Sequence, residues 1–229
     1  MEKNLTQGSV IKNIMYFALP YLLSYFLQQL YGMADLYMIG MFGGVDGTTA
    51  VTNGSQVMYM LTVIIVGLAM GATVMIGKAV GGGKLRDAAA AIGNTVTLFM
   101  GLSVVITAVL LCLARPVVLL IGTPAEAVEG TVSYLIICFI GIPFIVAYNI
   151  ISSIFRGMGD SKSPMFFIGV ACVVNVILDY VFMGRMQMGP AGAALGTTLA
   201  QTVSVVVALF YMKGRKTGIS LKRQDFIPR

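Results

Sequence analysis

The chain has 229 residues, of which 58% are hydrophobic and 10% are charged, and its mean hydropathy is +0.90. A soluble domain of this length needs far more polar surface, so the composition excludes a soluble fold and indicates an integral membrane protein. The net charge of +6 does not indicate nucleic-acid binding, because the basic residues lie in short segments between apolar runs.

Six apolar runs of about 20 residues follow one another along the chain. We expect each to be a transmembrane helix, because lipid offers no partner to an open backbone and the alternation typical of barrel strands is absent. The expected spans are 14–39, 55–76, 92–113, 132–154, 165–182 and 191–211. Residues 1–212 would then form one six-helix unit, followed by a basic cytoplasmic linker or tail at 213–229.

The basic residues predict how the spans are oriented. All 15 Lys and Arg residues except Arg115 and Arg185 lie at the N-terminus, after the second or fourth span, or in the tail. By the positive-inside rule, both termini are expected in the cytoplasm. The first run lacks a small-residue cleavage site, so we expect it to stay in the protein as its own targeting signal. The prediction is a multi-pass protein of the cytoplasmic membrane.

Proline and glycine within the spans predict local geometry. Pro20 and Pro143 each remove a backbone hydrogen bond and are expected to kink the first and fourth spans, either as hinges or as ordinary membrane-helix prolines. The spacing of Gly67 with Gly71, and of Gly192 with Gly196, predicts close helix packing.

Two carboxylates, Asp35 and Asp179, lie inside apolar runs, whereas the other seven of the nine acidic residues lie in loops or tails. Each would cost about 2.5–3.5 kcal/mol at the centre of a helix in lipid, so neither is expected to face lipid. Both lie toward the outer end of their spans and could converge on one site. The alternative is that one of them is interfacial and reaches the water among the headgroups.

Other polar residues share helix faces with these acids. The first span carries Ser24, Gln28, Tyr31 and Asp35, the fifth carries Asn175 and Asp179, and the sixth carries Thr197, Gln201 and Ser204. Interhelical hydrogen bonding accounts for the Ser and Thr residues but poorly for two carboxylates. Carboxylates beside Asn and Thr oxygens suit a hard cation such as Na⁺, or a proton shared between the acids. The pattern therefore predicts a coupling-ion site.

The sequence offers little for an enzyme. It has no His, no nucleophile motif and no nucleotide-binding loop. Gly81-Gly82-Gly83-Lys84 has a superficial likeness to a phosphate loop, but Leu85 stands where the Ser or Thr of that motif is required. We expect no enzymatic activity and no ATP site, so any transport is expected to be secondary.

Four stretches resemble one family, that of the multidrug and toxic compound extrusion (MATE) transporters. The stretch from Leu30 to Asp35, followed by Gly40, resembles the first MATE helix. Residues 156–164 (RGMGDSKSP) resemble the loop between helices four and five. Residues 175–179 (NVILD) and 189–197 (GPAGAALGT) resemble helices five and six. The resemblance runs in order along essentially the whole chain.

The resemblance implies an all-α fold of twelve helices in two lobes, of which this chain would be the N-terminal six-helix lobe. It implies a secondary antiporter that exports cationic or amphipathic drugs in exchange for Na⁺ or H⁺, in a bacterial or archaeal inner membrane. The helix-one sequence looks closest to the branch that includes the DNA-damage-inducible transporters. The expected partners are a small-molecule substrate, the lipid bilayer and a C-terminal lobe that this sequence does not contain, with no nucleic acid.

The resemblance also implies roles for individual residues. Cation or proton binding, with Na⁺ as a possible ligand, falls to Asp35, Asn175, Asp179 and Thr197. A supporting polar network is implied for Tyr31 and Asn149. No cofactor is implied apart from the coupling ion.

Two other functions stay open at this point. One is a flippase for lipid-linked sugars from the same superfamily, although such proteins generally need more basic residues in the membrane than this chain has. The other is a non-transporting membrane module that only packs against a partner.

Overall fold

A computed structural model describes residues 8–214 and 223–227, and helices make up nearly all of this part of the chain. The helices are α1 (Val10–Phe42), α2 (Gly44–Gly81), α3 (Leu85–Leu120), α4 (Ala125–Ile140), α5 (Ile142–Gly157), α6 (Lys162–Asp179), η1 (Tyr180–Arg185), α7 (Gly189–Gly214) and η2 (Arg223–Phe226). Five are long and apolar enough to cross a membrane, and α4 with α5 make a sixth span bent by 49°. The predicted all-α membrane fold is confirmed.

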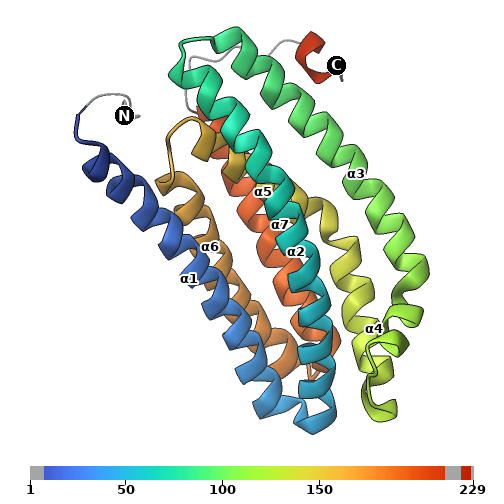
Figure 1. Cartoon of the computed structure of the whole chain (residues 1–229). Helices are drawn as coiled ribbons and strands as arrows, with labels where there is room; N and C mark the ends of the chain where they lie inside the picture. The colour runs from blue at the N-terminus through green and yellow to red at the C-terminus, as the bar shows by residue number, and fades with distance from the viewer. Residues whose placement is uncertain (1–7, 215–222, 228–229) are drawn as a thin grey trace.

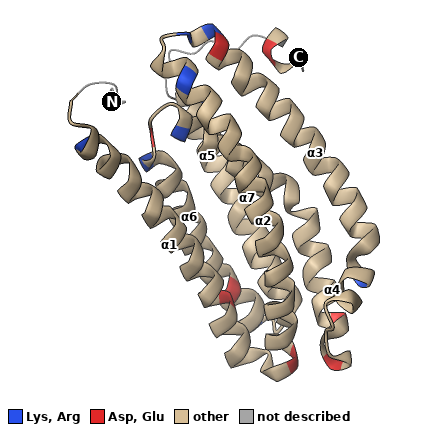
Figure 2. Ribbon diagram, viewed as in Figure 1, with Lys and Arg blue, Asp and Glu red and all other residues tan. Residues whose placement is uncertain are grey.

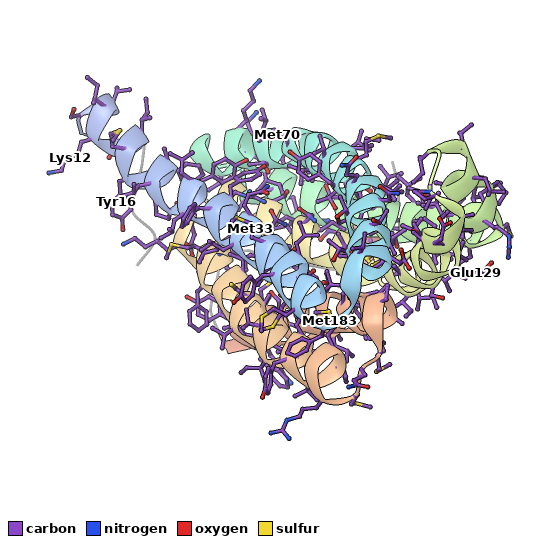
Figure 3. The ribbon with its side chains drawn as sticks, turned by 90° about the horizontal axis from the view of Figure 1, so that it is seen from below. Lys12, Tyr16, Met33, Met70, Glu129 and Met183 are labelled. Carbon is purple, nitrogen blue, oxygen red and sulfur yellow. The ribbon has the colours of Figure 1, made fainter. Side chains whose placement is uncertain are left out.

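The helices form one bundle in which α1 and α6 lie side by side on one flank and α3 and α4 lie on the other (Figure 1). Between these flanks, α2, α5 and α7 make up the middle of the bundle. Seen from below, Lys12 and Tyr16 of α1 lie at the opposite edge from Glu129 of α4 (Figure 3). Most Lys and Arg residues gather at the end that holds the start of α1, the α2–α3 connection and the start of α6 (Figure 2).

The first three helices are longer than the apolar runs that predict them, with 33, 38 and 36 residues. The extension of α2 includes a threonine-rich stretch that hydropathy alone would not place in a span. Thr48 and Thr52 each donate a hydrogen bond of 2.7 Å to the carbonyl four residues earlier. Because this bond satisfies the hydroxyl inside the helix, α2 continues through the polar stretch.

The fourth span is broken where glycine and proline fall close together. Gly141 ends α4, and Pro143 lies in the first turn of α5, where its missing N–H has no helical partner to lose. A Cβ on Gly141 would lie 2.7 Å from a methyl carbon of Thr198 on α7. The kink expected at Pro143 is confirmed, and the absence of a side chain at Gly141 lets α7 pack closely against the chain at this position.

The two glycine pairs behave differently. A Cβ on Gly192 would lie 3.1 Å from the Cβ of Phe182, so close packing at the start of α7 is confirmed. At Gly67 and Gly71, a Cβ would meet no described atom within 4 Å, and both glycines are exposed. The close packing predicted for that pair is wrong within this chain, because this face of α2 points away from the bundle.

The short turn η2, within the segment that the sequence predicts to be a linker or tail, packs against α3. Arg86 of α3 binds the buried Asp225 carboxylate through two nitrogens, at 2.8 and 2.9 Å. Thr97 donates a hydrogen bond of 2.7 Å to the Phe226 carbonyl. Gly93 lies directly beneath the Asp225 backbone, and a Cβ there would overlap it. Three positions on one face of α3 thus hold the turn.

Replacing Gly93 with Ala is expected to release η2 from α3. The added methyl would occupy the place of the Asp225 backbone and weaken the charged hydrogen bonds to Arg86, which are worth about 1.5–3 kcal/mol. Hydrogen–deuterium exchange of residues 223–227 should become about tenfold faster or more. Gly101→Ala, where α3 has open space, serves as the control. Equal exchange in the two variants would show that the contact contributes nothing to stability.

Candidate cation site

The two intramembrane acids meet between α1 and α6. The side chains of Asp35 and Asp179 are buried, with residue exposures of 5% and 0%, and Asn175 and Thr197 connect their carboxyl groups through hydrogen bonds. A carboxylate is costly to bury alone, and two adjacent ones repel each other. A proton or a metal cation between them removes both penalties.

Two neutral side chains complete the cluster. Thr197 of α7 donates a hydrogen bond of 2.9 Å to Asp35 Oδ2. The Asn175 amide lies 3.5 Å from both Asp179 Oδ1 and Thr197 Oγ1. The cluster therefore joins α1, α6 and α7 through one connected set of polar atoms.

Several oxygens of the cluster lack donors. Asp35 Oδ1, Asp179 Oδ2 and Asn175 Oδ1 are buried and have no hydrogen-bond partner within residues 8–214 and 223–227. Unpaired buried acceptors are rare, because each loses its hydration without compensation. Hard oxygen donors of this kind are the ligands preferred by Na⁺-like cations, and the same oxygens could hold a shared proton. The residues present fit either coupling ion.

The local sequence explains why these side chains face inward. Asn175 and Asp179 lie one turn apart on the row of α6 that also buries Phe167 and Ala171. On α1, Asp35 and Ile39 are one turn apart and are the buried residues in the C-terminal half of the helix. The apolar residues of each row pack against the bundle, so the polar residues of the same row also face inward.

A second polar layer lies one turn before Asp35 on α1 and one turn after Thr197 on α7. Gln201 donates a hydrogen bond of 3.2 Å to the Tyr31 hydroxyl. Gln201 is 4% exposed, and its side-chain oxygen has no partner among the described residues. The sequence placed Gln201 on the polar face of the sixth span but did not assign it to the site. Its position four residues after Thr197 is the signal that could have done so.

Asn149 lies apart from this cluster. Its amide donates a hydrogen bond of 2.8 Å to the Ile145 carbonyl, and it lines a pocket with Tyr21, Thr73 and Arg156. The Arg156 guanidinium lies 4.9 Å from the centre of the Tyr21 ring. The structure thus brings together Asp35, Asn175, Asp179 and Thr197, places Tyr31 in the adjoining layer, and places Asn149 in a different pocket.

This chain is similar to proteins named as multidrug resistance proteins. The family model MatE matches residues 20–181. The chain is 33% identical, over 90% of its length, to the probable multidrug resistance protein YpnP of Bacillus subtilis (strain 168), of which it covers 46%. It is 28% identical, over 94% of its length, to the probable multidrug resistance protein NorM of Thermotoga maritima, covering 45%. The chain therefore spans about half the length of these relatives.

Solved structures give the same result for the fold. The crystal structure of a MATE protein in the bent conformation superposes with a TM-score of 0.90 and 26% identity, over 97% of this chain and 50% of the other. The match to half of that chain corresponds to one six-helix lobe. With the family model matching most of its length, this chain belongs to the MatE family of multidrug and toxic compound extrusion transporters.

Proposed function

We propose that this chain is the ion-coupling half of a secondary multidrug exporter. Asp35 and Asp179, assisted by Asn175 and Thr197, bind Na⁺ or H⁺, and release of that ion is coupled to export of a cationic or amphipathic compound. A matching second half completes the substrate cavity. The observation that carries the proposal is the pair of buried carboxyl groups, from α1 and α6, each with one oxygen that has no hydrogen-bond partner among the described residues.

The proposed cycle follows from the cost of leaving this pair unoccupied. With an ion bound, α1 can remain packed on α6 and α7 through the cluster. Without one, the two carboxylates repel each other, and a conformation that separates α1 from α6 becomes more favourable. An ion that binds one conformation more tightly shifts the population toward it, which is all that coupling requires.

The proposed orientation places the cluster toward the outer side of the membrane. The basic ends of α2, α5 and α7 would face the cytoplasm, following the positive-inside rule. In this orientation the cluster is reached first by ions entering from outside. That is the direction in which a sodium or proton gradient across an inner membrane drives exchange.

An efflux assay with a completed transporter tests the proposal. The chain would be co-expressed with the C-terminal half of a MATE relative, and ethidium efflux would be followed in everted vesicles or cells. Efflux is expected to persist when ATP is depleted but the ion gradients are maintained. It should stop when the Na⁺ and H⁺ gradients are both dissipated. Efflux that follows ATP and ignores both gradients would contradict a secondary exporter.

A further inference from the structure

Two adjacent residues of α7 contact the two acids, one through a hydrogen bond and the other through steric contact. Thr197 reaches Asp35 with its hydroxyl, at 2.9 Å. The preceding residue, Gly196, is buried, and the Asp179 carboxyl lies directly over its Cα. A Cβ at position 196 would overlap Asp179 Oδ1. Adjacent residues of one helix therefore set the positions of the two carboxyl groups.

The carboxyl group that lies on Gly196 is also incompletely partnered. Asp179 is fully buried, and its Oδ2 has no hydrogen-bond partner in the described part of the chain. Its Oδ1 receives only the long 3.5 Å contact from Asn175. Hydrogen bonds thus hold this carboxyl group weakly, and steric contact with the backbone of α7 limits where it can lie.

We propose that Gly196 determines which cation the site accepts, by fixing the gap between the Asp179 and Asp35 carboxyl groups. The inference rests on the proposed function, since it concerns the same cation site. A glycine here leaves the Asp179 carboxyl room to rest against α7. Any side chain at 196 displaces that carboxyl and changes the size of the gap. Gly196 is a positioning residue, because it acts through Asp179 and offers no ligand atom of its own.

The size of a binding gap decides between cations of equal charge. Li⁺ is smaller than Na⁺, so it keeps more of its coordination when the space between the ligands is reduced. A methyl group on position 196 takes up space beside the Asp179 carboxyl. The expected result is a site that loses Na⁺ affinity and retains more of its Li⁺ affinity.

The test is calorimetric titration of the purified 229-residue chain in detergent with NaCl and with LiCl. Gly196→Ala should lower Na⁺ affinity by about tenfold or more, in the range seen when groups that orient metal ligands are altered. The ratio of Li⁺ to Na⁺ affinity should rise. An unchanged ratio in a folded Gly196→Ala variant would overturn the inference.

Two glycines supply matched controls. Gly192→Ala, one turn earlier on α7, crowds Phe182 without touching a carboxyl group, so it should lower the melting temperature and leave the ratio unchanged. Gly32→Ala, one turn from Asp35 on α1, has open space and should change neither property. A ratio that rises equally in Gly192→Ala would mean that general loosening of α7, rather than Asp179, is responsible.

A double-mutant cycle tests the contact between position 196 and Asp179 without relying on ion binding, and it remains informative if Gly196→Ala is destabilised. The loss of melting temperature caused by Gly196→Ala is measured with Asp179 present and again in the Asp179→Ala background. If the Asp179 carboxyl lies on position 196, the loss should be at least halved in that background. Equal losses would overturn the inference. Absence of both Na⁺ and Li⁺ binding by the wild-type chain would also overturn the inference, whereas the proposed function is tested separately by the efflux assay with dissipated gradients.

Discussion

Asn in place of Asp35 or Asp179 is expected to abolish ion-coupled efflux while leaving the chain folded. The amide keeps the shape of the side chain but removes the negative charge that holds Na⁺ or H⁺. It also removes the repulsion that favours separation of α1 from α6 when the site is empty. Ion affinity should fall by more than about tenfold, or 1.4 kcal/mol, in either variant. Ethidium efflux by the completed transporter should fall to the level of cells without it.

Asp46→Asn is the matched control for this pair. Asp46 lies in the first turn of α2 and is exposed, so its charge is solvated and holds no partner in place. Efflux should remain near the wild-type level in that variant. If Asp35→Asn and Asp179→Asn also keep wild-type efflux, the two acids do not carry the coupling ion.

Loss of the aromatic ring at position 167 is expected to be the most destabilising single change in the bundle. Phe167 is fully buried, and its ring centre lies 5.6 Å from that of Phe155 and 5.5 Å from that of Tyr211. These three rings join α5, α6 and α7. Removing a buried ring leaves a cavity, and Phe→Ala changes of this kind cost about 3–5 kcal/mol in soluble proteins. In a membrane the packing loss remains, although the transfer of apolar surface from water does not contribute.

The neighbouring Phe166 provides the control for that prediction. It has nearly the same sequence context, but it is 57% exposed, on the face of α6 that points away from the bundle. Phe167→Ala should lower the apparent melting temperature in detergent by about 6–12 °C, taking a 3 kcal/mol loss. Phe166→Ala should lower it by about 2 °C or less. Similar losses in both variants would show that the ring cluster does not hold the three helices together.

Much of the fold follows from hydropathy, because lipid forces each long apolar run into a helix. The break in the fourth span was also predictable, since Pro143 cannot complete the hydrogen-bond ladder. The extra length of α2 was not predictable from hydropathy. Its threonine hydroxyls donate hydrogen bonds to carbonyls of the same helix, and a hydropathy scale does not register such contacts. The docking of η2 depends on Gly93 lying beneath Asp225, a contact between residues far apart in sequence.

The two acids of the site could be identified from the sequence, but the arrangement of the helices that carry them could not. Helical spacing puts Asn175 and Asp179 on one face, and the cost of burying charge marks Asp35 and Asp179 as unusual. Spacing within a helix says nothing about which helices meet. Similar depth in the membrane left convergence of Asp35 and Asp179 as one possibility, and the family resemblance implied the pairing of α1 with α6 and α7. Gly196 was interpreted only as a packing residue, because its effect on a carboxyl group depends on that pairing. Asn149 was grouped with the site, but it lies on α5, beyond the break at Gly141, and lines another pocket.

Infrared difference spectroscopy of the carboxyl groups, on the purified chain in lipid, tests the central claim most directly. Addition of Na⁺ at constant pH, and acidification without Na⁺, should each change the carboxyl bands of the wild-type protein. The changes should compete, because one site holds both ions. Both should disappear in Asp35→Asn and in Asp179→Asn and persist in Asp46→Asn. A wild-type spectrum that responds to neither ion, or responses that survive in the two site variants, would contradict a cation site at Asp35 and Asp179.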